Sequence, residues 1–279
     1  MDVDRHRSPL GDWTLARWTP PDLAGLVEGV WCFQGSMALP RERHFPLGTL
    51  DLIVHLGPVY RHVQGHRSDP FPRSCFSGLL LESDVIEAPP GPSSVLGIRL
   101  LPPGAWALLG RPLDELSGHT VELDEVLPGR VAALEDRLHG VPSPEARVRV
   151  AVRWLRARLG APQDPGVRWL VDRIAARNGR VRIRDLQERA GLHRTTLTER
   201  FREQVGVTPK RFARIARFRR ALDLVRADEV PLVEVALSSG YYDQPHLNRE
   251  FREMSGFSPS GYRGRIRFPE SASLAEAPP

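Results

Sequence analysis

One pattern occurs twice in the last hundred residues of this chain, and it restricts the possible folds more than any other feature. The first copy runs from Ala190 to Pro209 and the second from Ser239 to Pro259. Four matched pairs stand 50 positions apart: Leu197 and Leu247, Phe201 and Phe251, Gly206 and Gly256, Pro209 and Pro259. A repeat of this length with matched apolar positions indicates a duplicated supersecondary unit.

Each copy has the features of a helix-turn-helix. A short amphipathic helix comes first, with apolar residues Val181, Ile183, Leu186 and Ala190 in one copy and Val233, Val235, Ala236 and Leu237 in the other. Gly191 or Gly240 follows, and glycine tolerates the left-handed backbone of such a turn. In the second helix of each copy a leucine and a phenylalanine four apart turn one face inward. A plain helical bundle is the alternative for a single copy, but two copies in register favour the helix-turn-helix.

The outward positions of the second helices are polar. We expect helices 194–204 and 244–254 to enter successive major grooves of duplex DNA. The residues predicted to contact bases are Thr195, Thr198, Glu199, Gln244, Asn248 and Arg249; those predicted to contact phosphates are Arg194, Arg202 and Arg252. Arg249 is the residue we select for a guanine contact, because arginine is the commonest bidentate partner of O6 and N7.

The charge of the chain is concentrated in the duplicated region. Residues 167–267 hold 22 Lys and Arg against 12 Asp and Glu, a net charge of +10, whereas the whole chain carries only +5. The remainder is therefore acidic, at −5. A basic segment of this kind is typical of a module that binds nucleic acid, and the acidic half must have another task.

Residues from about 167 to 265 resemble the DNA-binding domain of the AraC family of bacterial transcription regulators. The matching residues are Leu186, Ala190-Gly191-Leu192, Leu197, Phe201, Gly206, Thr208-Pro209 and Phe212 in the first half, and Val235-Ala236, Ser239-Gly240-Tyr241, Leu247, Arg249, Phe251, Gly256, Ser258-Pro259 and Tyr262 in the second. The resemblance implies two helix-turn-helix units in one chain, bridged by a long helix. Pro245 departs from the pattern, but the first turn of a helix tolerates proline.

Proline and glycine mark a domain boundary at residues 160–166. We predict a sensing or dimerisation domain over 1–160, a linker over 161–166, a DNA-binding domain over 167–265 and a disordered tail over 266–279. The bridging helix, residues 209–226, carries an apolar stripe of Phe212, Ile215, Phe218, Leu222 and Val225.

The first domain favours an α+β fold class for the chain as a whole. Residues 1–12 are polar and we expect them to be loosely ordered. Short strands are predicted over 50–56, 60–64, 74–80 and 95–101, and helices over 104–109, 130–138 and 144–159. Strands separated by turn signals indicate a small β-barrel or sandwich. Residues 95–110 and 113–116 resemble the N-terminal domain of a subset of AraC-type regulators, which implies a cupin-like fold.

The acidic half has no clear catalytic or metal-binding motif. His62 and His66 stand four apart on one predicted strand, too far apart for easy chelation, so we predict no metal site. We predict no catalytic residue and no cofactor, because no phosphate loop or nucleophile set is present. Cys32 and Cys75 are best interpreted as buried apolar residues.

The hypothesis is a cytoplasmic bacterial transcription regulator that binds double-stranded DNA and responds to a small-molecule effector through its first domain. One alternative is a constitutive DNA-binding regulator whose first domain only dimerises. Another is an enzyme with a fused DNA-binding tail. RNA polymerase and a second copy of the chain are further candidate partners. No apolar run of about 18 residues is present, so no membrane span is expected.

Overall fold

The computed structural model describes residues 1–189, 194–265 and 274–276, and its element order is β-rich first and helical later. The strands are β1 Asp2–Ser8, β2 Gly11–Trp18, β3 Val27–Met37, β4 Arg41–His44, β5 Leu50–His55, β6 Arg61–Gln64, β7 Arg67–Pro70, β8 Ser74–Ser77, β9 Asp84–Glu87, β10 Ser93–Leu100, β11 Thr120–Glu122 and β12 Leu274–Glu276. The helices are α1 Pro102–Leu109, α2 Leu123–Val126, α3 Ala132–His139, α4 Pro144–Arg156, α5 Pro165–Ala176, α6 Ile183–Arg189, α7 Arg194–Val205, α8 Pro209–Ala227, α9 Leu232–Ser239, α10 Gln244–Ser255 and α11 Pro259–Arg263. Short 3₁₀ turns lie at Pro21–Leu23 (η1) and Asp114–Leu116 (η2).

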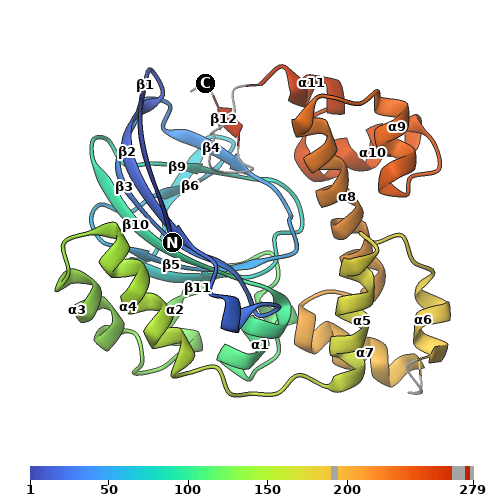
Figure 1. Ribbon diagram of the computed structural model, residues 1–279, viewed down its shortest axis with the longest axis horizontal. Coiled ribbons are helices and arrows are strands. Elements are labelled where there is room, and N and C mark those ends of the chain that lie inside the picture. Colours follow the sequence, from blue (N-terminus) through green and yellow to red (C-terminus); the bar gives the residue numbers. More distant parts are fainter. Residues whose placement is uncertain (190–193, 266–273, 277–279) are drawn as a thin grey trace.

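The strands form two antiparallel sheets. The larger has the order β1-β2-β3-β10-β5-β8-β11 and the smaller the order β12-β4-β9-β6-β7. Helices α3 and α4 lie on one side of these strands, and helices α5 to α11 stand beside them (Figure 1). The predicted α+β class is confirmed, with an antiparallel β-domain (β1 to β11 with α1 to α4) followed by an all-helical region (α5 to α11).

The period of two along each strand separates a core face from a cavity face. On β5, Leu50, Leu52 and Val54 are buried in the main core, while Asp51 and Ile53 line a cavity. Neighbouring side chains of a strand point to opposite faces, so this division follows from the sequence once the sheet is formed. One side of the larger sheet is therefore closed by helices and the other faces the cavity.

The prediction of a loosely ordered N-terminus is wrong. Residues 2–8 form β1, which pairs with β2 from Asp2 opposite Arg17 to Ser8 opposite Gly11. His6 stacks on Trp13 with ring centroids 4.0 Å apart. The segment has little apolar content of its own, so its order comes from backbone pairing with a neighbouring strand that sequence periodicity does not reveal.

The C-terminal helices have the predicted duplicated arrangement. Helix α8 runs between the unit of α6 and α7 and the unit of α9 and α10 (Figure 1). Its five predicted stripe residues are all buried. Thr208 caps α8 and Asp243 caps α10, the latter by accepting from the His246 N–H at 2.7 Å. Gly240 ends α9 with φ of 84°, as predicted, whereas Gly191 lies outside the described residues.

One part of the predicted inward face of α9 is wrong. Val235 and Ala236 are buried, but Val233 and Leu237 are 50% and 56% exposed. Residues 233 and 237 are four apart and share a face, and that face of the short helix points away from α8 and α10. The apolar character of these residues does not by itself indicate which side of α9 packs against its neighbours.

The prediction of a disordered tail is wrong for residues 274–276. These three form β12 and pair with β4, with Ala275 opposite Glu42. An edge strand offers unpaired backbone groups to any extended segment in reach, which composition does not disclose. The other residues of the predicted tail lie outside the described residues.

Candidate nucleic-acid interface and neighbouring cavity

Helix α7 presents its predicted reading residues at the surface. Leu197 and Phe201 are fully buried, and Thr195 and Glu199 are exposed on the opposite side. Thr198 is half-buried. The leucine and phenylalanine four apart fix the rotation of the helix, so the polar residues between them face outward. The side chain of Arg194, the first residue of α7, lies outside the described part of the structure.

Helix α10 repeats this arrangement. Leu247 and Phe251 are fully buried, while Arg249 and Arg252 are exposed. Neither arginine makes an ion pair within the described part of the chain. Gln244 and Asn248 are half-buried, and the Asn248 side-chain oxygen is enclosed without a hydrogen-bond partner in that part. A base contact by Asn248 would therefore require the amide to turn outward.

A charged cluster that our sequence analysis missed holds α10 against α8. Arg214 on α8 donates to Glu250 and to Glu253 on α10, each at 2.8 Å. Arg217 and His246 lie 3.6 and 3.9 Å from Glu250. Burial works against the charge of Arg214, yet its hydrogen bonds to Glu253 and Glu250 raise its pKa. The cluster fixes the orientation of α10 against α8.

Helix α7 is held at the matching position by a different pair. Arg200 of α7 stands 50 residues before Glu250, and its guanidinium lies 2.7 Å from Asp164, the N-cap of α5. The charge at this repeat position thus differs in sign between copies, while its task is the same. Comparison of the two copies would have revealed the charged position, but not either partner.

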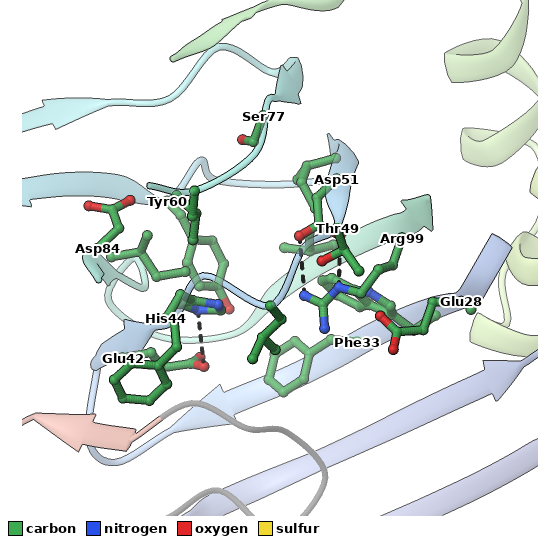
Figure 2. A pocket seen from close by; sticks show the side chains of 18 of the residues that line it. Glu28, Phe33, Glu42, His44, Thr49, Asp51, Tyr60, Ser77, Asp84 and Arg99 are labelled. Carbon is green, nitrogen blue, oxygen red and sulfur yellow. Dashed lines mark hydrogen bonds and ion pairs between the residues drawn. The ribbon is translucent and has the colours of Figure 1, made fainter. Parts of the chain in front are cut away.

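A cavity of about 520 Å³ lies between the sheets, and α8 contributes to its wall. The β-domain supplies aromatic residues such as Trp31, Phe33 and Tyr60, and α8 supplies Arg219, Asp223 and Arg226. Figure 2 shows two polar groups facing this space, the Arg99–Asp51 pair and the His44–Glu42 pair. Arg99 donates to both oxygens of Asp51, at 2.9 and 3.2 Å.

The Arg99–Asp51 pair follows from sheet register. The two residues are direct cross-strand partners on β10 and β5. The Asp51 carboxylate raises the pKa of the largely enclosed Arg99 guanidinium, against the opposing effect of burial. The neighbouring Gly97 lies under the ring of Trp31, its partner on β3, and a Cβ atom at residue 97 would overlap that ring.

Comparisons with known proteins identify the type of domain in the C-terminal region. Residues 186–265 match a family described as a helix-turn-helix domain. The HTH-type transcriptional regulator MtrA of Neisseria gonorrhoeae is 28% identical over 115 residues, which cover 39% of this chain and 34% of MtrA. The HTH-type transcriptional activator RhaS of Escherichia coli is 32% identical over 101 residues, or 36% of this chain and 35% of RhaS.

Residues 186–265 form an AraC-type helix-turn-helix domain. The alignments span about a third of the length of these two curated relatives. Ahead of the AraC-type domain, residues 18–122 match a family described as a domain of unknown function. Among solved structures, ToxT from Vibrio cholerae is 11% identical, with a TM-score of 0.46 over 84% of this chain and 97% of ToxT.

The AraC-type domain docks on the β-domain through the end of α7. Arg202, a predicted phosphate contact, lies 3.0 Å from Asp114 of η2. The Leu113 N–H donates to the Glu203 carbonyl at 2.7 Å, and the Ser117 hydroxyl donates to the Gly206 carbonyl at 2.7 Å. The β-domain thus holds a residue that our prediction assigns to DNA.

A second docking point lies beside the middle of α8. Phe45 of the β-domain is buried against Phe218 and Tyr262, with ring centroids 6.4 and 5.8 Å away. Arg219 of α8 donates to the Leu47 carbonyl at 3.3 Å and also pairs with Glu28. The β-domain is therefore in contact with α7 of the first helix-turn-helix unit, with the bridging helix α8 and with α11.

The remaining candidate groups of the β-domain have structural surroundings. His62 pairs with Asp84, and within residues 1–189, 194–265 and 274–276 no three metal-ligating side chains gather. Cys32 and Cys75 are buried free thiols, and burial raises their pKa values to about 11 and about 12. Among the described helices none combines the length and apolar character needed to cross a membrane.

Proposed function

We propose that this chain is a sequence-specific DNA-binding transcription regulator. The observation that carries the proposal is the pair of recognition helices, α7 and α10, which bury matched Leu and Phe residues and leave polar faces exposed. The relatives named as transcriptional regulators and activators support it. The two helices read successive major grooves, which requires that α8 hold them about one helical turn of DNA apart, roughly 34 Å.

In this proposal the residues divide into two groups. Thr195, Thr198, Glu199, Gln244, Asn248 and Arg249 contact bases, and Arg194, Arg202 and Arg252 contact phosphates. The exposed Arg249 reads guanine. The three arginines that contact phosphates set the register of the protein on the duplex.

We further propose that a small molecule in the β-domain cavity modulates DNA binding. The supporting observation is the shared wall, because Arg219, Asp223 and Arg226 belong to α8, the helix that joins both DNA-reading units. A ligand in the cavity touches that helix directly. Its contacts can therefore change the energy of the arrangement in which α8 and α7 are docked on the β-domain.

The test is selection of genomic DNA fragments by the purified full chain at about 150 mM salt, where non-specific phosphate binding is weak. We expect enrichment of two short sequence blocks about one helical turn apart. A parallel selection with residues 161–279 separates two kinds of failure: enrichment only in the shorter chain means that the β-domain restrains binding, and enrichment in neither refutes the proposal. Effector control fails if no small molecule that binds the cavity changes DNA affinity, which is the result expected of a constitutive regulator.

A further inference from the structure

The cavity has a charge that differs in sign from that of the chain. Its lining contains five carboxylates and four arginines, so it is net negative when the histidines are neutral. The whole chain carries a net charge of +5. General attraction to this protein would favour anions, whereas the local potential of the cavity favours cations.

The arginines of the lining are already engaged. Arg99 is bound to Asp51, Arg219 to Glu28 and Arg17 to Asp4. Arg226 is not free either. An anionic ligand would have to displace a protein carboxylate from one of these pairs, and breaking an ion pair that is partly removed from water is unfavourable.

Asp223 is the contrasting group. It lies on α8, lines the cavity and has no ion pair within 4.0 Å among the described residues. The side chain is exposed at the mouth of the cavity, and its partial burial raises the pKa of its carboxyl, which the charges of Arg219, Arg226 and Arg220 offset only in part. Because no described cation pairs with this carboxylate directly, a positive group placed beside it would be stabilised.

The rest of the lining suits an apolar body with a positive charge. Trp31, Phe33, Tyr60 and Phe71 all contribute aromatic surface. Aromatic faces attract organic cations through the negative potential of the ring. A volume of about 520 Å³ is within the range of sites that enclose drug-sized ligands.

We propose that the cavity binds a hydrophobic organic cation, with its positive charge facing Asp223 and its apolar body against the aromatic side chains. This inference rests on the proposed function, because it names the chemical class of the effector that the β-domain takes.

The test uses two probes of the same shape and opposite charge. Binding of tetraphenylphosphonium and of tetraphenylborate to the full chain is measured by isothermal titration calorimetry. We expect the phosphonium to bind at least about tenfold more tightly, since the two differ only in the sign of their charge. Equal affinity, tighter binding of the borate, or no binding of either probe would overturn the proposal.

A matched pair of variants places the cation. Asp223→Asn removes one negative charge from the cavity, and we expect it to weaken phosphonium binding about tenfold. Asp172→Asn removes the same charge from α5, where the carboxylate pairs with Arg168 outside the cavity lining, and should leave phosphonium binding unchanged. Equal effects of the two variants would show only a general charge effect and would overturn the assignment.

DNA binding measured without any probe separates this inference from the function on which it rests. Fluorescence anisotropy of a selected DNA fragment reports the DNA-binding half alone. Loss of phosphonium binding with intact DNA binding contradicts only the ligand class. Intact phosphonium selectivity without any DNA binding contradicts the proposed function and supports the ligand class.

Discussion

At the scale of a residue, two arginines on α7 and α10 differ in the partners that surround their side chains. Arg249 and Arg202 both lie on the outer faces of these helices. Arg249 is exposed and makes no ion pair within the described residues, whereas Arg202 lies 3.0 Å from Asp114 of the β-domain. In the proposed complex Arg249 contacts DNA without rearrangement, whereas Arg202 must first leave Asp114.

Arg249→Ala should weaken binding to the selected DNA sequence by about 1–3 kcal/mol and relax specificity at one base pair. The physical reason is loss of a bidentate contact to a guanine edge. Anisotropy titrations against the selected sequence and its single-base variants check both effects. Arg252→Ala is the comparison, since a phosphate contact should weaken all sequences alike. A uniform loss for Arg249→Ala would assign that residue to phosphate.

Asp114→Asn should raise DNA affinity by a few fold, because it removes the charge that pairs with Arg202. The effect is modest, since the Arg202 side chain is already 59% exposed and its ion pair is screened by solvent. Glu115→Gln is the matched control, as it removes a neighbouring charge that pairs with Arg111 instead. DNA titrations of both variants check this, and equal affinities would mean that Asp114 does not restrain α7.

At the scale of an element, one charged position in each repeat connects a recognition helix to a neighbour. In α7 this is Arg200 with Asp164 at the start of α5, and in α10 it is Glu250 with Arg214 of α8. Asp164 also accepts from the Gly166 and Val167 N–H groups, at 2.8 and 3.2 Å. The Asp164 carboxylate thus caps the N-terminus of α5 and also binds α7 through Arg200.

Asp164→Ala should cost about 1–2 kcal/mol of unfolding free energy at pH 7, the range for a lost N-cap. Burial opposes ionisation of Asp164, but its hydrogen bonds to the Val167 N–H and to Arg200 lower the pKa below the ordinary 3.8. A lowered pKa means that its charge stabilises the fold above 3.8 and that this contribution is lost as pH falls through the folded value.

Denaturant unfolding of the native chain and of Asp164→Ala between pH 7 and pH 3 checks this. The difference in unfolding free energy between the native chain and Asp164→Ala should become smaller as the pH approaches 3. Asp164→Asn keeps a capping oxygen and should lose less at pH 7. A difference that is constant with pH would show that the charge of Asp164 does not contribute.

At the scale of the whole molecule, the β-domain and the AraC-type domain share buried surface. Leu197, Phe201 and Val205 of α7 belong to the same core cluster as Leu108 and Leu113 of the β-domain. Phe45 belongs to the cluster of the second helix-turn-helix unit. The cavity, α8 and both recognition helices are thus parts of one connected structure.

Phe45→Ala should weaken this connection and cost about 2–4 kcal/mol, somewhat less than a phenylalanine deletion inside a single core because the interface can separate. Calorimetry should show a lower or divided unfolding transition. Leu237→Ala is the control, as its side chain is 56% exposed on α9. An unchanged transition for Phe45→Ala would mean that the second unit is held without that side chain.

The sequence by itself determined the elements whose signal is local. The bridging helix, both recognition helices and strands such as β5 could be predicted because their apolar residues recur with the period of a helix or strand, and that period follows from backbone geometry. The duplication added the correspondence between the two units. The exposed positions of Thr195, Glu199 and Arg249 followed from the same period.

Only the tertiary structure decided which distant residues meet. Strand β1 is ordered by pairing with β2, Phe45 enters the core of the second unit, and Asp114 pairs with Arg202. Contacts between distant segments also determine which side of α9 is buried and which α8 residues line the cavity. Each depends on chain segments that are far apart in sequence, and burial, ion pairing and strand register are properties of such pairs. No local pattern contains them.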